Sequence, residues 1–492
     1  MNPGKKRTRA EALRLGFLGG VALSVPAGVG VAWSQSPASA STPFEAELAV
    51  PPVLRPTRRT STTDFYRVVM REAEARILPG KPTTIWGYNG IFPGPTIRAR
   101  KGRRAVVNFA NSLPEDTVVH LHGAYADGRN DGHPNDPIRP GSSKNYLYIN
   151  DQNARTMWYH DHVMSLTSPH VYKGLAGMYL LGDSFEDRLP LPKGSYDVPL
   201  TIVDRSFNAD NSFNYPGGVF GNLILVNGRP QPRFEVAARR YRLRFLNASN
   251  AQSFALALDS GDPMTLIGTE GGLLHRPVEV TALPITMAER YEVVVDFGRY
   301  AVGRSIVLKN LKGLVDGTRD VMRFDVVRRE SDPSRVPATL RPPAAQVDPT
   351  HLSDDTSVVR ATRRWVFDQT DGHWTINGLM WDANRVDASP KEGDSEVWEF
   401  VNDGGVEHPA HPHLINFRVM ERNGRAPLAH ERGWKETVAV GPFETVRVLM
   451  KWPKVPVTPG STSPWLRKYP FHCHQLEHED HMMMVQFEVT KP

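Results

Sequence analysis

Cysteine is almost absent from this chain, because Cys473 is the only one in 492 residues. A single cysteine excludes an internal disulfide, whatever the redox state of the compartment. It also needs protection, because an accessible thiolate is readily oxidised. We therefore expect Cys473 to be buried or bound to a metal ion.

The chain also lacks a large excess of charge of one sign. The formal net charge of the whole chain is +6, but residues 1–40 hold five basic residues and one acidic residue, a net of +4. The rest of the chain therefore carries only +2. This balance does not indicate a basic patch, and we expect no nucleic-acid partner.

Long amphipathic helical patterns are scarce. The chain contains 41 prolines and 40 glycines, between short runs that are rich in Val, Ile, Phe, Arg and Thr. This pattern predicts an all-β protein with many turns. The length predicts two to four domains.

Residues 1–40 have the pattern of an export signal. A basic region ends at Arg14, residues 16–33 are uncharged, and Ala38-Ser39-Ala40 is a plausible cleavage site. An uncleaved membrane anchor is the alternative, but Pro26 weakens the run as a spanning helix. The export route stays open, since Arg7-Thr8-Arg9 lacks adjacent arginines. We expect an exported monomer (periplasmic, secreted or at the cell or spore surface) without a membrane partner after cleavage.

A weak repeat divides the remaining chain. An Asn-Gly pair is followed by an alternating strand that ends in Asn, and this terminal Asn lies 20 to 25 residues after the Asn of the pair. It occurs as Asn89-Gly90 with 106–111, Asn227-Gly228 with 241–247, and Asn377-Gly378 with 397–402. Three copies predict three homologous β-sandwich domains, at 44–188, 189–340 and 355–492.

The stretch 471–484 holds the cysteine between two histidines, His472 and His474. Successive side chains of a β-strand point to opposite faces. His472 and His474 would therefore share one face, and Cys473 would point the other way. One short strand would thus contact two metal sites that are joined covalently.

Ten of the 17 histidines fall in four clusters, and each cluster contains a His-x-His pair. The pairs are His120/His122, His160/His162, His411/His413 and His472/His474. Eight such imidazoles suit a site with several metal ions between the first and third domains, and imidazole is a good ligand for copper. A lone pair is more often a hydrogen-bonded strand pair, but four pairs around a cysteine argue against that interpretation.

The remaining candidates are His408, Cys473, His478 and Met483. Two imidazoles, a thiolate and a weak axial thioether form the ligand set of blue-copper sites. Structural zinc usually has four ligands with more cysteine and does not explain ten histidines. For Met482 and Met484 we expect core packing. Surface or core roles are expected for the unpaired histidines His133, His170, His275, His351, His373, His430 and His481.

These motifs resemble those of three-domain bacterial multicopper oxidases of the laccase type. The resemblance covers nearly all of the chain after residue 40 and is nearest to the branch of spore-coat laccases, bilirubin oxidases and phenoxazinone synthases. It rests on the histidine motifs and on Phe92-Pro93-Gly94-Pro95-Thr96, Asp197-Val198-Pro199-Leu200, Leu225-Val226-Asn227-Gly228, Tyr241-Arg242-Leu243-Arg244 and Ala288-Glu289-Arg290-Tyr291. Pro412 departs from the family pattern, and we expect an edge strand or a kink there.

The resemblance implies three cupredoxin-like Greek-key β-sandwich domains and four copper ions per chain. It implies a type 1 copper on His408, Cys473, His478 and axial Met483, with electron uptake at an exposed edge of His478. It also implies a type 2 copper on His120 and His411. The type 3 pair would take His122, His160, His162, His413, His472 and His474. Glu479 matches a proton-relay glutamate of the family, and Asp131 resembles an aspartate near the type 2 copper.

The implied function is the one-electron oxidation of small phenolic or aromatic amine donors, coupled to the four-electron reduction of dioxygen to water. Alternatives are a cuprous-ion or manganese oxidase of the same superfamily, a two-copper enzyme such as a nitrite reductase, and a non-enzymatic copper-binding coat protein. Met482 to Met484 form the only methionine cluster, which lowers the cuprous option. For the donor pocket we expect the loops 206–221 and 453–470.

Overall fold

Strands dominate the computed structural model, which describes residues 41–215, 217, 220–346, 348–350 and 359–492. The expected export signal at 1–40 lies outside the described residues. A typical strand is Arg104–Asn111, whose side chains alternate between buried and partly exposed. Such alternation packs one face of a sheet against a core and leaves the other towards solvent. Among the described residues, no helix is long and apolar enough to span a bilayer.

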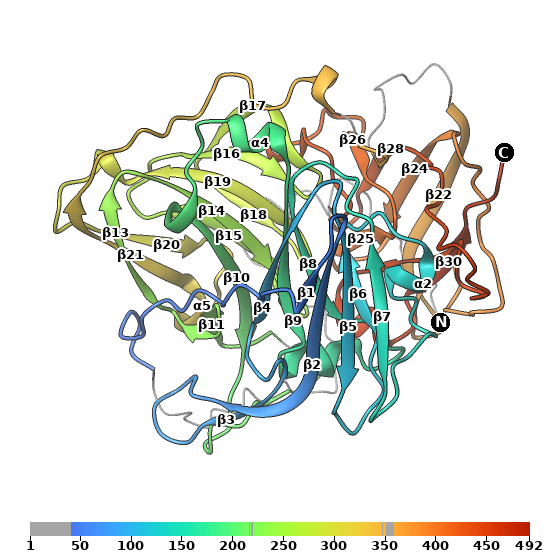
Figure 1. Cartoon of the computed structure of the whole chain (residues 1–492), viewed down its shortest axis with the longest axis horizontal. Helices are drawn as coiled ribbons and strands as arrows, with labels where there is room; N and C mark the ends of the chain where they lie inside the picture. The colour runs from blue at the N-terminus through green and yellow to red at the C-terminus, as the bar shows by residue number, and fades with distance from the viewer. Residues whose placement is uncertain (1–40, 216, 218–219, 347, 351–358) are drawn as a thin grey trace, which may run out of the picture. The chain divides into compact units, whose positions relative to one another are not determined.

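The first domain, blue to green in Figure 1, packs two sheets against each other. One sheet has the order β1-β2-β5-β7, with β3 paired to β2. The other has the order β4-β9-β8-β6. The strands are β1 (Arg58–Arg59), β2 (Thr63–Ala75), β3 (Thr83–Tyr88), β4 (Gly94–Arg100), β5 (Arg104–Asn111), β6 (Val119–His122), β7 (Ser143–Tyr148), β8 (Arg155–Asp161) and β9 (Ala176–Gly182).

The middle domain, green to yellow in Figure 1, has the sheet orders β12-β11-β10-β14-β19-β16-β17 and β13-β21-β20-β15-β18. Its strands enclose a large aliphatic and aromatic core. They are β10 (Asp197–Arg205), β11 (Leu223–Val226), β12 (Arg229–Pro230), β13 (Arg233–Ala238), β14 (Arg240–Asn247), β15 (Phe254–Leu258), β16 (Met264–Thr269), β17 (Gly272–Val280), β18 (Leu283–Ile285), β19 (Arg290–Asp296), β20 (Ser305–Asn310) and β21 (Asp320–Arg329).

The third domain, orange to red in Figure 1, has the sheet orders β23-β22-β24-β28-β26 and β27-β25-β29-β30. Cys473 and Met483 belong to its hydrophobic core. The strands are β22 (Val359–Thr370), β23 (His373–Ile376), β24 (Ser395–Asn402), β25 (His408–Pro412), β26 (Phe417–Arg422), β27 (Val438–Val440), β28 (Thr445–Lys451), β29 (Lys468–Cys473) and β30 (Met484–Glu488).

Short helices and turns connect the strands. They are α2 (Gly128–Asp131), α3 (Thr167–Lys173), α4 (Ser184–Arg188), α5 (Asp316–Arg319) and α6 (Leu476–Asp480), with 3₁₀ turns at Gly194–Tyr196, Phe297–Arg299, Pro343–Ala345 and Ala429–Glu431. This content confirms the predicted all-β class.

The repeat seen in the sequence is a structural repeat. Both residues of each Asn-Gly pair have positive φ, for example 57° at Asn89 and 68° at Gly90. The asparagines that end β5, β14 and β24 also share one role, because each side-chain amide donates to two backbone carbonyls and accepts one backbone N–H two residues ahead. Each of these strands pairs in parallel, with β2, β10 and β22 respectively. The domain boundaries 44–188, 189–340 and 355–492 stay predictions.

Two seams join the middle domain to its neighbours. A hydrophobic cluster that includes Trp158 and Met178 from the first domain and Leu246 from the middle domain forms one of them. The other is charged, since Lys435 Nζ of the third domain lies 2.8 Å from Glu270 Oε1 and 2.7 Å from Glu289 Oε1. All three side chains are buried.

Candidate metal centre

The paired histidines come from two strand pairs, β6–β8 of the first domain and β25–β29 of the third. His120 is opposite His160 in the first register, and His411 is opposite His472 in the second. Opposed side chains of an antiparallel pair lie on the same face. Each strand pair therefore presents a patch of imidazoles on one side.

The structure brings these patches together into groups that could each hold a metal ion. Within each group the ligand atoms lie within 4.8 Å of one another, and every member is buried. The groups are His120/His411/His413, His122/His160/His474, His162/His413/His472 and His408/Cys473/His478, with a further one at His122/His411/Glu436. The first three combine residues from both the first and the third domain.

Cys473 lies on the other face of β29 from its two neighbours, as strand alternation predicts. Its Sγ is 3.4 Å from His408 Nδ1 and 3.7 Å from His478 Nδ1, and these two nitrogens are 3.2 Å apart. His472 and His474 belong to two other groups. The His474 N–H also donates to the Pro409 carbonyl oxygen at 2.7 Å, which ties β25 to the cysteine strand.

The imidazoles are held from behind by hydrogen bonds. The Nδ1 atoms of His120, His160 and His411 lie 2.6, 2.7 and 2.9 Å from the backbone carbonyls of Asp131, Asp161 and Glu436, to which they donate. Their Nε2 atoms are buried and without a hydrogen-bond partner among the described residues, as are Nε2 of His122 and both ring nitrogens of His474. Buried polar atoms are rarely left unpaired, so these nitrogens fit metal ligands.

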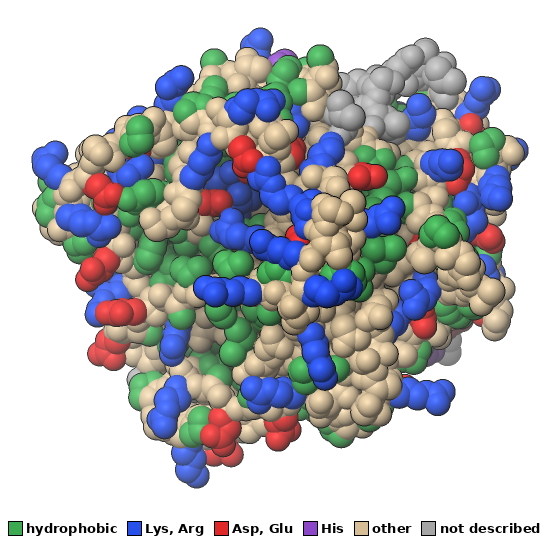
Figure 2. Space-filling model, viewed as in Figure 1, with side chains coloured by type: hydrophobic (Ala, Val, Ile, Leu, Met, Phe, Trp, Pro, Cys, Tyr) green, Lys and Arg blue, Asp and Glu red, His purple; other side chains and the backbone are tan. Residues whose placement is uncertain are grey.

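Electrostatics agree with this interpretation. Burial lowers the pKa of His160 and of His408 to about 3, so both imidazoles are neutral and able to bind a metal. Burial raises the pKa of the Cys473 thiol, so a cation is needed to hold the thiolate form. Figure 2 shows almost no histidine on the drawn face, in agreement with the burial of the clusters.

The two predicted acidic residues both contact the clusters. Asp131 Oδ2 lies 2.6 Å from His413 Nδ1, and burial raises the pKa of this carboxyl. Glu479 Oε2 lies 3.1 Å from His472 Nδ1, and Oε1 lies 3.6 Å from His162 Nδ1. Burial alone would raise the pKa of Glu479, but the adjacent imidazoles outweigh it and lower this pKa to about 2.

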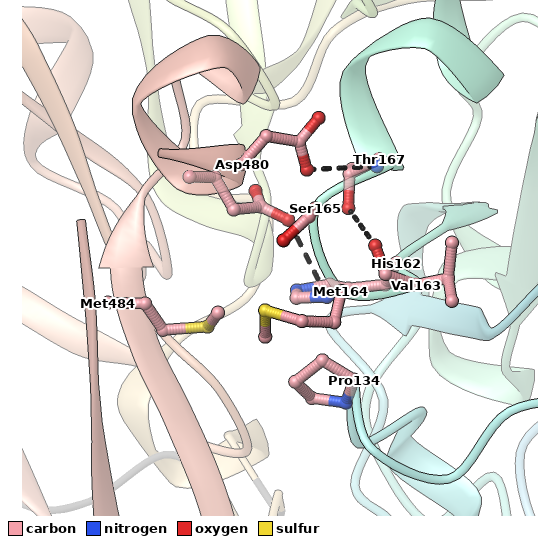
Figure 3. A pocket seen from close by; sticks show the side chains of 9 residues that line it. Pro134, His162, Val163, Met164, Ser165, Thr167, Asp480 and Met484 are labelled. Carbon is pink, nitrogen blue, oxygen red and sulfur yellow. Dashed lines mark hydrogen bonds and ion pairs between the residues drawn. The ribbon is translucent and has the colours of Figure 1, made fainter. Parts of the chain in front are cut away.

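Glu479 also borders a narrow hollow that Figure 3 shows from close by. His162, Met164 and Met484 lie around it, and the Asp480 carboxylate accepts the backbone N–H of Thr167 at 3.0 Å. The hollow is too narrow to hold a water molecule, and His162, which lines it, is buried.

Sequence reasoning missed a second pair of residues behind the imidazoles. Glu436 Oε1 lies 2.7 Å from His122 Nδ1, and the guanidinium Nη1 of Arg290 in the middle domain lies 2.5 Å from the same oxygen. Arg290 also donates to the Thr156 and Ala288 carbonyls. The middle domain therefore contacts the site through a salt bridge. Arg290 lies in the Ala288–Tyr291 motif, which was the available signal, whereas nothing in the sequence indicated Glu436.

Pro412 has the edge position expected for it. It is the last residue of β25 and lies beyond the three residues that pair with β27, so only β29 pairs with it and its missing N–H does not interrupt the ladder to β27. The expectation for Met482 is not met. Met482 is only half-buried, because the chain turns there with a φ of 72° before β30 begins at Met484, which is buried as expected.

His478 is also less exposed than expected. Its side chain is buried, with 4% of the residue exposed, and the indole of Trp374 is stacked on its ring. Of the unpaired histidines, His133, His170 and His430 are buried and His275, His373 and His481 are exposed. None of these six belongs to a metal group, while His351 lies outside the described residues.

Three multicopper oxidase family models match the chain, at residues 69–185, 200–311 and 361–492. Bilirubin oxidase of Albifimbria verrucaria is 38% identical over 485 residues, which cover 91% of this chain and 81% of that protein. A laccase of Bacillus subtilis is 33% identical, with 91% of this chain and 99% of that protein covered.

A solved laccase structure from Pediococcus acidilactici superposes with a TM-score of 0.82 at 32% identity, over 92% of this chain and 95% of that one. A multicopper oxidase structure from Aquifex aeolicus superposes with a TM-score of 0.79 at 30% identity, over 90% and 99%. With the buried histidine and cysteine groups, these likenesses show that the chain belongs to the multicopper oxidase family, of which it is a laccase-like member.

Proposed function

We propose that this enzyme oxidises small phenolic or aromatic amine donors by single electrons and reduces dioxygen to water with four of them. The observation that carries the proposal is the convergence of buried, unpartnered imidazole nitrogens from two domains beside a buried His-Cys-His group. Bilirubin, the donor named for one relative, is a further candidate.

Four copper ions per chain fit the ligand groups. His408, Cys473 and His478 would hold the type 1 ion, with Met483 as a weak axial ligand. His120 and His411 would hold the type 2 ion. The type 3 pair would lie on His122, His160 and His474 and on His162, His413 and His472. Imidazole and thiolate ligands suit both copper oxidation states.

When bound, copper supplies one-electron acceptance from the donor and four-electron storage for oxygen reduction. The chain contributes the connection, because Cys473 is covalently bonded to His472 and His474. It also excludes water, since every proposed ligand is buried. Asp131 and Glu436 fix the ring orientations of His413 and His122, so little reorganisation is needed on binding.

Protons for water formation must reach the imidazole groups from outside. Glu479 is suited to hold them, because its carboxylate lies between His472 and His162 and borders the hollow towards Asp480. Asp131 would assist from the side of His413. Each carboxylate contacts an imidazole that would hold copper, Glu479 that of His472 and Asp131 that of His413, so each could hold a proton beside the metal groups.

Copper content and oxygen uptake test the proposal together. Four copper ions per chain and oxygen consumption with a phenolic donor are expected. Two ions would instead favour a nitrite-reductase-like enzyme, and absence of oxygen uptake would favour a copper-binding coat protein. Kinetics with phenols, bilirubin, o-aminophenols, Mn(II) and Cu(I) side by side would identify the donor class. Faster oxidation of Cu(I) or Mn(II) than of the organic donors would favour a cuprous or manganese oxidase.

Replacement of the cysteine tests the connection. Cys473→Ser should remove the blue absorption and donor oxidation, because a hydroxyl does not replace the thiolate, while three copper ions stay bound to the imidazole groups. Metal analysis and the visible spectrum measure this. Donor oxidation at the native rate in the variant would contradict the proposed role of Cys473.

The cellular setting is also proposed rather than established. We infer export directed by residues 1–40, followed by action as a monomer on donors outside the cytoplasm. N-terminal sequencing of the protein from its native host would show whether residues 1–40 are removed.

A further inference from the structure

Trp374 separates the His408/Cys473/His478 group from solvent. Its indole ring is stacked on His478 with 3.8 Å between centroids and an interplanar angle of 24°, and its centroid lies 5.6 Å from that of His408. The two histidines are 4% and 1% exposed, whereas Trp374 is partly exposed. A donor that approaches His478 from this side therefore meets the indole before the imidazole.

The segment that contains Trp374 is partly exposed and includes further apolar residues. It lies on β23, opposite Gln369 of β22, and the exposed turn Asp371-Gly372 joins these strands. Leu379, Met380 and Trp381 follow along the chain and are all half-buried. The backbone N–H of Trp381 donates to the Met482 carbonyl oxygen at 3.1 Å. This bond places the segment beside the proposed type 1 ligands.

A partly exposed indole has two properties that suit an aromatic donor. Aromatic rings stack on it with a favourable energy beyond the burial of apolar area. A continuous stack of donor, indole and imidazole also leaves no water-filled gap on the path of the electron. By contrast, the two loops expected to form the pocket contact the first domain, through Tyr215 to Ser168 and Thr458 to Asp127.

We propose that Trp374 is the docking residue for the electron donor, on the premise of the oxidase function given above. A phenol or aromatic amine stacks on the outer face of the indole, and one electron passes from the donor to the copper ion that His408, Cys473 and His478 would hold. The oxidised donor releases its hydroxyl or amine proton to water. The indole itself is neither oxidised nor reduced overall.

The test compares native enzyme with Trp374→Leu and Trp374→Phe, each loaded with copper. Trp374→Leu should raise KM for aromatic donors roughly three- to tenfold, the loss expected for one aromatic stack. Trp374→Phe keeps a stacking face and should stay within about twofold of native. Ferrocyanide, an inorganic one-electron donor that cannot stack, should reduce the blue centre of all three proteins at similar rates in anaerobic stopped flow.

Two readouts do not depend on turnover. The position of the blue absorption band should be the same in all three proteins, since Trp374 supplies no ligand atom. Saturation-transfer NMR should detect binding of benzamide, a redox-inert aromatic, to native enzyme and Trp374→Phe but not to Trp374→Leu. Phe443→Leu is the control, because Phe443 is an aromatic side chain with 56% of its surface exposed, outside both loops expected at the donor pocket and outside the metal groups.

Three outcomes would overturn the inference. An unchanged KM in Trp374→Leu would mean that donors approach elsewhere, for example through the cavity of about 210 Å³ bordered by Glu407 and Leu428. An equal loss with ferrocyanide, or a displaced blue band, would mean that Trp374 shapes the acceptor instead of docking the donor. If native enzyme oxidises no aromatic donor at all, the proposed function fails before any variant is compared.

Discussion

Glu479 has the clearest consequence at the scale of single residues. Its carboxylate contacts one imidazole from the third domain, His472, and one from the first domain, His162. Glu479→Gln keeps the size of the side chain and removes its ability to hold and pass a proton. Oxygen consumption at saturating donor should fall on the order of 10²-fold, the contribution typical of a positioned acid or base, while the blue absorption stays unchanged.

Glu477→Gln is the control for that measurement. Glu477 is a buried carboxylate two residues away that accepts the Ser168 hydroxyl at 2.9 Å and belongs to no metal group. Its replacement should leave oxygen consumption near the native rate. Undiminished consumption in Glu479→Gln, or an equal loss in both variants, would contradict a proton-relay role for Glu479.

The proposed ligands could be predicted from the sequence because they are close together in the chain. A His-x-His pair needs only strand alternation to place two imidazoles on one face. Glu436, Arg290 and Trp374 could not be predicted in this way. Glu436 and Trp374 each contact a histidine more than 100 residues away, and Arg290 contacts Glu436 over a similar separation. Their contacts depend on how domains and hairpins pack, and single-sequence patterns do not encode that.

At the scale of elements, β8 depends on a helix for its position. Asp161, between His160 and His162, accepts from the Val118 N–H, and its Oδ2 lies 3.0 Å from His170 Nδ1 of α3. Burial would lower the pKa of His170, but Asp161 and Glu115 outweigh it and raise this pKa above its ordinary value. The raised pKa favours the protonated form of His170, and this side chain connects α3 to the metal-site strand.

This connection predicts a pH-dependent stability. A histidine whose folded-state pKa is raised stabilises the fold below its unfolded pKa of about 6.5 and loses that contribution as pH rises through the folded-state value. His170→Gln should therefore lower the free energy of unfolding by about 1–3 kcal/mol at pH 6, and by less at pH 9. Denaturant unfolding of native and variant enzyme at both pH values measures the difference.

His430→Gln provides the opposite sign as a control. Burial lowers the pKa of His430, so the native histidine is disfavoured at low pH, and its replacement should cost less at pH 6 than at pH 9. If the cost of His170→Gln were the same at both pH values, a charged His170 would be the wrong description.

Elements were predicted well where local chemistry determines them. The Asn-Gly turns and terminal asparagines mark the same hairpins and strand ends in all three domains, because both residues of each turn adopt positive φ. Pro412 was predicted at an edge for a similarly local reason, because proline has no N–H to donate, and β27 indeed pairs only with the first three residues of β25.

At the scale of the whole molecule, the seam between the middle and third domains contains a buried charge imbalance. Lys435 faces two carboxylates, Glu270 and Glu289. Burial raises the pKa of Glu270 to about 7, even though Lys435 opposes this shift. An acid with a raised folded-state pKa binds more protons when folded, so stability falls as pH rises from its unfolded value of about 4.3 to about 7.

Glu270→Gln should remove this loss. Relative to native enzyme, the variant should gain on the order of 2 kcal/mol in free energy of unfolding between pH 5 and pH 8, because an amide does not ionise. Unfolding curves at the two pH values test this. Thr269→Val is the control, since it removes a buried hydrogen bond to the Trp434 carbonyl at the same seam without any titrating group. A constant difference for Glu270→Gln would contradict the proposed titration.

The number and type of domains could be predicted from the sequence, but the contacts between the domains could not. Charged residues such as Glu270 and Lys435 look like surface residues in a single sequence, because burial of an ion pair is recognisable only when both partners are placed. The burial of His478 beneath Trp374 belongs to the same class of feature.

The origin of the ligands in two domains also has a consequence for how the enzyme matures. The His408/Cys473/His478 group lies within the third domain, whereas each of the three imidazole groups needs the first and third domains already docked. If these groups hold copper as proposed, colour and oxygen chemistry are acquired at different moments of biogenesis. A newly made chain could turn blue as soon as its third domain is packed, and it would become a working oxidase only after the later docking step.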